Sequence, residues 1–229
     1  MDALELWKRY RQYFCRVDSL DLTLDVSRMH FDEGFLASME PVAQRAFADM
    51  DALESGAIAN PDEKRMVGHY WLRAPMLAPT KDIAREITGT VQSIKQFAAD
   101  VHAGKSRPPL AARFTQVLAI AIGGSVLGPM FVSDALGDPA ADRIRIHFID
   151  NTDPDGIART LETLKGLLPE TLCIVTSKSG GTPDTRNGMA IVAEAYRAGN
   201  LSFARHAVAV TMPGSQMDNL AASELPPTA

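Results

Sequence analysis

A dense group of hydrogen-bond donors follows one of the apolar runs of this chain. The stretch reads "VTSKSGGTPDTRNGM", from Val175 to Met189, and it lies between the run "TLCIVTS" and a helical pattern. Gly180 and Gly181 would allow the backbone to approach a ligand closely. After Thr176, four side chains supply hydroxyl groups: Ser177, Ser179, Thr182 and Thr185. These residue types at this spacing could bind an anion.

The stretch also leads into a predicted helix start. Thr182 precedes Pro183, and a threonine cap followed by proline at the first helical position is a typical N-terminus. The free N–H groups and the positive end of the helix dipole favour an anion there, and a phosphate with several oxygens suits them better than a single carboxylate. Lys178 either adds electrostatic attraction or is a solvated surface lysine. An ordinary capped loop without a ligand is the alternative interpretation of the whole stretch.

A second polar turn, Gly123-Gly124-Ser125, follows the apolar run "QVLAIAI". Ser125 either caps a helix that begins at Val126 or lies beside a ligand. It is not the nucleophile of a G-x-S-x-G elbow, because residue 127 is leucine. No Gly-Lys-Ser/Thr triplet gives a nucleotide phosphate loop, because residue 99, five positions before the glycine of Gly104-Lys105-Ser106, is alanine, and the G-x-G-x-x-G pattern of dinucleotide binding is also missing.

The residue pattern in the second half of the chain predicts the strands and helices that position these turns. Four apolar runs, "QVLAIAI", "IRIHFID", "TLCIVTS" and "HAVAVTM", are separated by helical patterns at residues 126–136, 155–167 and 183–198. Continuous apolar runs are typical of parallel strands with helices on both faces. We therefore predict an α/β fold, a three-layer sandwich with a parallel sheet. Ligands of such sheets bind beyond the carboxyl ends of the strands, where both polar turns fall.

The first half of the chain has a different pattern, which predicts a mainly helical N-terminal region over residues 1–110 and an α/β domain over residues 111–229. Alternation at residues 20–26 predicts a half-buried strand, and Asn60-Pro61-Asp62-Glu63 has the form of a helix start. A further helix is expected to open at Thr80 and to end near His102, with Gly104 supplying the left-handed stop.

Composition excludes several classes of function. The chain has 229 residues, 46% of them hydrophobic and 22% charged, with a formal net charge of -5, so neither nucleic acid nor an anionic membrane is an expected partner. The N-terminus does not resemble a secretion signal, and the longest uncharged run contains glycine and proline, so we expect a cytoplasmic protein without a membrane anchor. Cys15 and Cys173 are expected to be reduced thiols in the core, and five scattered histidines give no metal site. No cofactor is implied.

Several motifs together resemble the glucose-6-phosphate isomerase family, in its bacterial form. They are "AIGGSVLGP", "NTDPDGI" and "SKSGGTPDTRN", which begin at Ala121, Asn151 and Ser177, and "VGHYWLRAPMLAP" at Val67 extends the similarity into the helical half. The resemblance covers about residues 60–220. It implies a sugar-isomerase (SIS) domain, and an enzyme that interconverts glucose 6-phosphate and fructose 6-phosphate through an enediol, as in glycolysis and gluconeogenesis.

The same resemblance assigns residues to the substrate. Ser177, Lys178, Ser179 and Thr182 fall on the phosphate-loop positions of the family, and Thr185 falls at the end of that loop. Gly124 and Ser125 fall on the turn beside the sugar, although Val126 stands where many relatives have a polar residue.

The family's proton-transfer residues are not found in this sequence. The family uses a glutamate, a histidine, a lysine and an arginine, the last in a Gly-Gly-Arg motif, and no such motif is present. Glu194 and Glu224 are interpreted as solvated carboxylates, so no catalytic residue is assigned. The resemblance implies the N-terminal part of a longer, homodimeric isomerase that contains only the first SIS domain, and we expect such a part to be inactive alone.

Two other functions remain open. The chain could be a complete SIS module that binds a sugar phosphate as a sensor or regulatory subunit. It could also be part of a glutamine-dependent aminosugar synthase, which shares the Ser/Thr phosphate loop, although "GHYWLR" and "NTDPDGI" speak against this.

Overall fold

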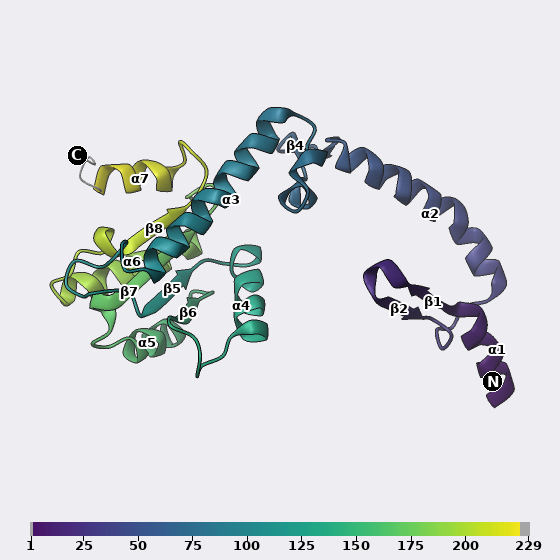
Figure 1. The fold of residues 1–229 in the computed structure, drawn as a ribbon, viewed down its shortest axis with the longest axis horizontal. Coiled ribbons are helices and arrows are strands. Elements are labelled where there is room, and N and C mark those ends of the chain that lie inside the picture. Colours follow the sequence, from purple (N-terminus) through teal and green to yellow (C-terminus); the bar gives the residue numbers. More distant parts are fainter. Residues whose placement is uncertain (1, 225–229) are drawn as a thin grey trace. The chain divides into compact units, whose positions relative to one another are not determined.

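A computed structural model describes residues 2–224 of the chain, and Figure 1 labels its helices and strands. Contacts between residues divide the chain into two compact units, Met1–Thr90 and Val91–Ala229. Each unit has its own secondary structure and its own buried side chains.

The first unit is mainly helical, as the sequence predicts, and it also contains two short hairpins. Its elements are α1 (Ala3–Tyr13), β1 (Phe14–Val17), η1 (Asp18–Leu20), β2 (Leu22–Asp25), α2 (Glu33–Glu54), β3 (Ile58–Asn60), β4 (Arg65–Met66), η2 (His69–Leu72), η3 (Pro75–Leu77) and the first part of α3 (Lys81–His102).

The predicted strand near residue 20 exists, but the prediction that it is half-buried is wrong. β2 pairs only with β1, in an antiparallel hairpin of two strands. Leu22 and Leu24 are 53% and 58% exposed. Pairing along one edge satisfies backbone groups, whereas burial of a face requires a covering layer, and a two-stranded hairpin has none of its own.

The predicted helix start at residue 60 is also wrong. The side chain of Asn60 does accept a hydrogen bond from the N–H of Glu63, at 3.0 Å, as a helix cap would. The chain then turns at Lys64, which has a φ of +52°, and enters β4. The motif therefore builds the turn of a β-hairpin, because asparagine side chains stabilise turns by the same bond that caps helices.

Helix α3 confirms the third prediction in this half. The hydroxyl of Thr80 accepts a hydrogen bond from the N–H of Ile83 at 3.3 Å, and Gly104 has a φ of +70° just beyond the last turn. The helix has one strongly apolar face, and in the second unit this face carries Phe97 and the buried Val101 onto the sheet.

The second unit is built on a parallel sheet of four strands in the order β6-β5-β7-β8 (Figure 1). The predicted α/β fold is therefore confirmed. Its strands and helices are β5 (Gln116–Ile120), α4 (Gly124–Leu136), β6 (Arg145–Ile149), α5 (Pro154–Thr163), η4 (Leu168–Glu170), β7 (Thr171–Thr176), α6 (Pro183–Ala198), η5 (Ala204–His206), β8 (Ala207–Val210) and α7 (Gln216–Glu224).

Successive strand residues bury their side chains on opposite faces of this sheet, which accounts for the continuous apolar runs. On one face, Leu118 and Ile120 of β5 pack with Ile157 of α5 and Val192 of α6. On the other face, Val117 and Leu172 pack with the end of α3. The three layers are thus α5 and α6, the sheet, and the last turns of α3.

Helix α6 lies unusually close to the sheet. It continues through Asn187-Gly188, and a Cβ atom at Gly188 would be 3.2 Å from Ile120 Cγ2 and 3.3 Å from Ile149 Cγ2. The absence of a side chain at Gly188 permits this close approach of α6 to β5 and β6.

Candidate functional site

The polar turns predicted from the sequence share one edge of the sheet. β5 pairs with β6 and with β7 in parallel register, so the turns that follow these strands leave from the same end. The turn after β7, residues 177–185, is here called the anion loop. The turn after β5 begins at Ala121, and the turn after β6 covers residues 150–153.

The anion loop is held by hydrogen bonds among its own side chains and backbone. The Ser177 hydroxyl is buried, accepts from the N–H of Gly180 at 3.1 Å and shares a hydrogen bond with the Thr182 hydroxyl at 3.0 Å. The Ser179 hydroxyl accepts from the N–H of Gly181 at 3.2 Å. Gly180 has a φ of +71°, a conformation that strains other residues. Lys178 and Ser179 are exposed.

Thr182 lies at the N-cap of α6, as predicted, but its hydroxyl does not cap the helix. That hydroxyl bonds to Ser177 instead, and no side-chain cap bond is formed at this N-terminus. The next residue, Pro183, has no N–H, so the N–H groups of Asp184 and Thr185 are the first that α6 presents. They form the positive end of a 16-residue helix.

Thr185 has a polar atom that the fold leaves unsatisfied. The residue is 2% exposed, and its hydroxyl oxygen is buried without a hydrogen-bond partner among the residues that the structure describes. Most buried hydroxyl groups in proteins are hydrogen-bonded, because leaving one unpaired costs about 1–3 kcal/mol. Such a group in the first turn of α6 is suited to a ligand that supplies the missing partner.

The turn after β5 differs from its prediction in one respect. Helix α4 begins at Gly124, with Gly123 as its N-cap and no side-chain cap bond, so the interpretation of Ser125 as the cap is wrong. Gly123 has φ +55° and ψ −129°, a region open only to glycine, and this turn starts the helix at Gly124 rather than at Val126. Ser125 and Gly124 are exposed on the open turn, where nothing lies within 4 Å of a Cβ at Gly124.

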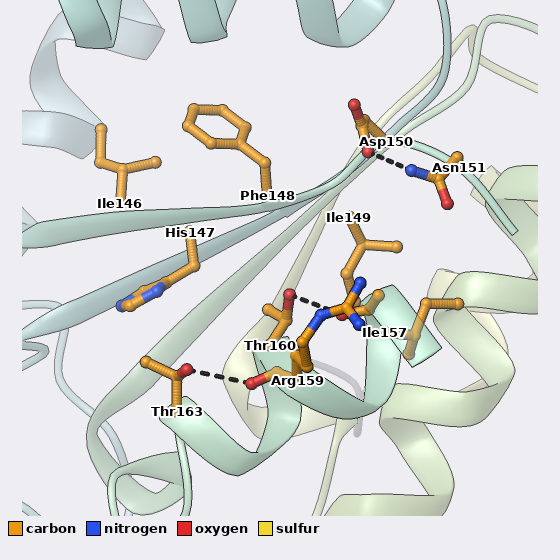
Figure 2. A pocket seen from close by; sticks show the side chains of 11 residues that line it. Ile146, His147, Phe148, Ile149, Asp150, Asn151, Ile157, Arg159, Thr160 and Thr163 are labelled. Carbon is orange, nitrogen blue, oxygen red and sulfur yellow. Dashed lines mark hydrogen bonds between the residues drawn. The ribbon is translucent and has the colours of Figure 1, made fainter. Parts of the chain in front are cut away.

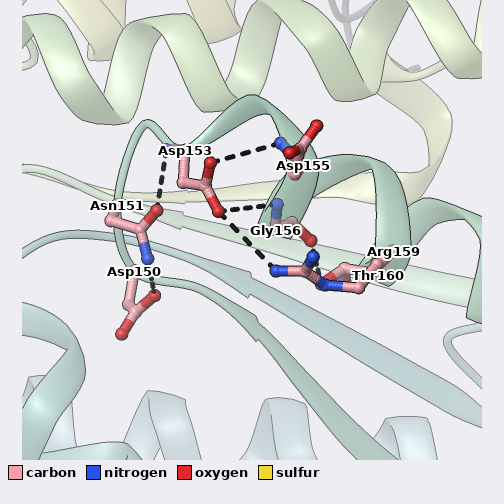
Figure 3. Close-up of polar contacts among 7 residues, drawn as sticks. All are labelled: Asp150, Asn151, Asp153, Asp155, Gly156, Arg159 and Thr160. Carbon is pink, nitrogen blue, oxygen red and sulfur yellow. Dashed lines mark hydrogen bonds and ion pairs between the residues drawn. The ribbon is translucent and has the colours of Figure 1, made fainter.

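The turn after β6 uses its polar side chains to build itself (Figure 3). Asn151 accepts from the N–H of Asp153 at 2.8 Å and donates to Asp150 at 2.7 Å. Asp153 caps α5 by accepting from the N–H groups of Asp155 and Gly156, at 3.3 and 2.9 Å. The "NTDPDGI" motif is therefore a structural cap, and its Asp153 carboxylate is bound by backbone N–H groups and by an ion pair with Arg159 at 3.7 Å.

A pocket of about 490 Å³ is lined by residues of β6, of α5 and of the turn between them (Figure 2). His147 contributes its ring to this pocket and bonds to the Gln116 side chain at 2.9 Å. Burial, and then the charge of Arg145, lower the pKa of His147, which favours its neutral form. Thr160 and Thr163 donate to carbonyl groups of their own helix, so these hydroxyls are already satisfied. None of the site residues predicted from the sequence lines this pocket.

A further turn, residues 211–217, follows β8 and contacts the anion loop, and it was not predicted as part of the site. The N–H of Met212 donates to the carbonyl of Lys178 at 3.2 Å. A signal was present, because Ser215 followed three residues later by Asp218 has the form of a helix cap, and Ser215 does accept from the N–H of Asp218 at 3.1 Å. The parallel register of β7 and β8 then brings this cap beside the loop.

The two glutamates interpreted as solvated carboxylates lie outside these turns. Glu194 is exposed and forms an ion pair with Arg197 on α6, as that interpretation requires. The side chain of Glu224 lies outside the described residues. Over residues 2–224, no three His, Cys, Asp or Glu side chains are grouped so as to hold a metal ion. Within the same residues, no helix combines the length and apolar character that crossing a bilayer requires.

Comparison with known proteins gives consistent results. The family model described as phosphoglucose isomerase matches residues 25–222. The chain is 58% identical over 222 residues to a glucose-6-phosphate isomerase of Geobacter sulfurreducens, and 55% identical over 224 residues to that of a Nostoc species. These alignments cover 96% and 98% of the chain but 42% of each relative. The chain thus spans about two fifths of the length of the curated relatives it matches.

A solved structure agrees with the sequence comparisons. The crystal structure of a glucose-6-phosphate isomerase from Chlamydia trachomatis superimposes with a TM-score of 0.77 at 27% identity. The match covers 94% of this chain and 42% of that one. The similarity therefore extends over both compact units.

Proposed function

The chain belongs to the phosphoglucose isomerase family, and from this premise we propose that its anion loop binds the phosphate group of glucose 6-phosphate or fructose 6-phosphate. In this proposal Ser177, Ser179, Thr182 and Thr185 supply hydroxyl groups, and Lys178 supplies positive charge. The N–H groups at the start of α6 supply further donors. The proposal takes residues 111–229 as the first SIS domain of an isomerase.

The observation that carries this proposal is the unpaired hydroxyl of Thr185. Its oxygen is buried with no partner in the described part of the chain, and it lies in the first turn of a helix whose N-terminus has no side-chain cap. A phosphate oxygen would satisfy the hydroxyl, and the helix dipole would stabilise its charge. An ordinary capped loop would be expected to use its N-cap threonine for capping, whereas here the Thr182 hydroxyl bonds to Ser177.

The sugar would extend from the phosphate toward the neighbouring turn. β5 and β7 are adjacent, so Gly124 and Ser125 leave the sheet beside the anion loop. The open space at Gly124 permits a ligand to approach the backbone, and the exposed Ser125 hydroxyl is available to a sugar hydroxyl. This arrangement supports an extended sugar phosphate that spans two strand ends.

The reaction proposed for the whole family protein is aldose–ketose isomerisation, in which a proton moves between C1 and C2 through an enediol. Such a reaction needs a base placed at the substrate carbons. We assign no catalytic residue to this chain, and so propose that the chain alone binds the sugar phosphate without turning it over. The complete protein is proposed to act as a homodimer.

A test of the anion loop compares binding with stability in Thr185→Val. Valine has the same shape as threonine but no hydroxyl, so removing an unpaired buried group is expected to leave the ligand-free melting temperature unchanged or slightly raised. Phosphate affinity, measured by titration calorimetry with fructose 6-phosphate and with inorganic phosphate, is expected to fall roughly tenfold. Thr163→Val is the matched control, because that hydroxyl bonds within α5, and it should leave affinity unchanged.

The wild-type chain is expected to melt at a higher temperature with fructose 6-phosphate and to be unaffected by fructose, since ligands that bind only the folded state stabilise it. A well-folded chain that binds no sugar phosphate would refute the proposal. Rapid turnover by the chain alone, in an assay coupled to glucose-6-phosphate oxidation, would refute the separation of binding from proton transfer.

A further inference from the structure

The turn of residues 211–217, here called the bracing turn, is joined to the anion loop by several hydrogen bonds. The N–H of Ser177 donates to the carbonyl of Val210 at 3.1 Å, which extends the pairing of β7 with β8 into the loop. The Lys178 carbonyl then accepts twice, from the N–H of Met212 at 3.2 Å and from the hydroxyl of Thr211 at 3.3 Å. The backbone of the anion loop is therefore tied to a segment that has no predicted role in the site.

The hydrogen bonds of the bracing turn have a defined direction. A hydroxyl carries one proton, and a carbonyl can only accept, so the proton of Thr211 is committed to Lys178. The 2.7 Å bond between the Thr211 and Ser215 hydroxyls must then be donated by Ser215. Ser215 in turn accepts from the N–H of Asp218 in α7, at 3.1 Å. A single chain of donors thus runs from the first turn of α7 to the Lys178 carbonyl.

This chain of bonds also sets the orientation of one peptide group in the anion loop. The C=O and N–H of a trans peptide point in opposite directions. Because the carbonyl of Lys178 points at Thr211 and Met212, the N–H of Ser179 points away from the bracing turn. A rotation of this peptide would turn a carbonyl oxygen toward the anion in place of a donor, and the two bonds to Lys178 oppose that rotation.

The bracing turn is itself anchored to the core and shaped to the loop. Met217 is buried within the apolar cluster that covers one face of the sheet. A Cβ atom at Gly180 would lie 2.3 Å from the backbone nitrogen of Met217, so only glycine allows the loop to lie against α7. The contact therefore has little freedom to shift, and the position of α7 is transmitted to the loop.

We propose that Thr211 is a positioning residue for anion binding, which acts through the Lys178 carbonyl to hold the Lys178–Ser179 peptide with its N–H toward the phosphate. Thr211 does not contact the ligand in this proposal. The inference rests on the proposed function of the anion loop and adds to it a third strand end, that of β8.

The test uses Thr211→Val and Thr211→Ser in the full chain. Valine removes the donor to Lys178 while keeping the branched shape, and serine restores the donor. We expect the dissociation constants for inorganic phosphate and fructose 6-phosphate to rise roughly three- to tenfold in Thr211→Val and to return to near the wild-type value in Thr211→Ser. The amide resonance of Ser179 should shift in Thr211→Val even without phosphate. Thr163→Val again serves as the control.

The outcomes separate this inference from the function on which it rests. No phosphate binding by the wild-type chain would overturn both. Wild-type binding with equal affinity in Thr211→Val would overturn the positioning role alone, and so would a loss of affinity that Thr211→Ser does not restore. If Thr211→Val fails to fold, Thr211→Ala gives the same comparison, because it also removes the donor to the Lys178 carbonyl; unchanged affinity there would count against the inference.

Discussion

The two compact units differ in how many of their apolar side chains are buried. In the second unit, Leu118, Ile120 and Val192 are buried between a sheet and its covering helices. In the first unit, Trp71 and Ser27 are the only side chains among those described that reach the same degree of burial. Trp71 is held there by packing and by a 2.9 Å hydrogen bond from its ring N–H to the carbonyl of Glu54.

The difference shows that apolar content does not by itself produce a core. β2 has leucines at alternate positions, as strands of the second unit have apolar residues, yet those leucines are exposed. What the second unit has in addition is layers on both faces of its sheet. Large exposed side chains in the first unit, among them Trp7, Leu20 and Phe47, leave apolar surface of the kind that commonly contacts another surface.

The largest predicted difference between the two units is in the loss of stability when one aromatic side chain in each is truncated. Tyr196 is fully buried on α6, and its hydroxyl donates to the carbonyl of Thr171 at 3.0 Å. Tyr196→Ala should lower the free energy of unfolding by about 3–5 kcal/mol, through a cavity and an unpaired carbonyl. Trp7→Ala, at a side chain that is 57% exposed, should cost less than about 1 kcal/mol.

Urea unfolding followed by circular dichroism would measure both truncations. Equal costs for Tyr196→Ala and Trp7→Ala would show that the two units are stabilised alike, contrary to the difference in burial.

A smaller loss of stability is expected when a glycine with a positive φ is replaced by alanine in each unit. Gly180→Ala places a methyl group 2.3 Å from the backbone of Met217 at a φ of +71°, whereas Gly56→Ala, at a φ of +98°, places one 2.9 Å from the side chain of Pro79. We expect about 2–3 kcal/mol for Gly180→Ala and about 1 kcal/mol for Gly56→Ala, because backbone anchored in a core cannot move aside. Thermal unfolding tests this, and the reverse order would contradict it.

The two units can also be compared by removing one helix-capping side chain from each. Asp153 caps α5, and Asp32 caps α2 by accepting from the N–H of Phe35 at 2.7 Å. Asp153→Ala should cost about 1 kcal/mol of global stability. Asp32→Ala should instead fray the start of α2, with faster amide exchange there and little change in the global transition. A global loss of equal size in both variants would argue that α2 unfolds together with the sheet.

The last prediction concerns reactivity and needs no change of sequence. Cys15 is exposed in β1, so the prediction that both thiols lie in the core is wrong for Cys15, whereas Cys173 is fully buried in β7. Burial raises the pKa of the Cys173 thiol to about 12, so at a mildly alkaline pH it is protonated as well as shielded. A thiol reagent should modify Cys15 alone in the folded chain and both cysteines in urea, as shown by mass spectrometry. Modification of Cys173 before unfolding would show that the sheet opens locally.

Much of the second unit could be predicted, because its strands and helices agree with their local patterns. Helix α6 occupies the predicted residues 183–198 and continues through Asn187-Gly188, where helical spacing outweighed the turn signal. Less of the first unit could be predicted from its sequence. Asn60-Pro61-Asp62-Glu63 makes the side-chain bond of a helix cap, but a left-handed residue at position 64 turns the chain into a hairpin. The local pattern specified this hydrogen bond but not the conformation of the residues after it.

The candidate site also has features that the sequence predicts and features that depend on tertiary contacts. The anion loop was found from the spacing of its hydroxyls, and its place at the end of β7 is set by the sheet. The unpaired state of the Thr185 hydroxyl could not be found, because it depends on what surrounds a buried atom. The contact of Thr211 with the Lys178 carbonyl could not be predicted either, because it requires β8 to lie beside β7, and local sequence patterns do not specify strand order.

The strand order has a consequence for the order in which the sheet can form as the chain is synthesised. β5 is made first and lies in the interior, between β6 and β7. β6 can pair with one edge of β5 as soon as it emerges. β7 can then pair with the other edge of β5, and β8 can pair with β7. Each strand made after β5 therefore has a partner already present when it emerges. Vectorial assembly of this kind shortens the time that unpaired strands remain exposed to other chains.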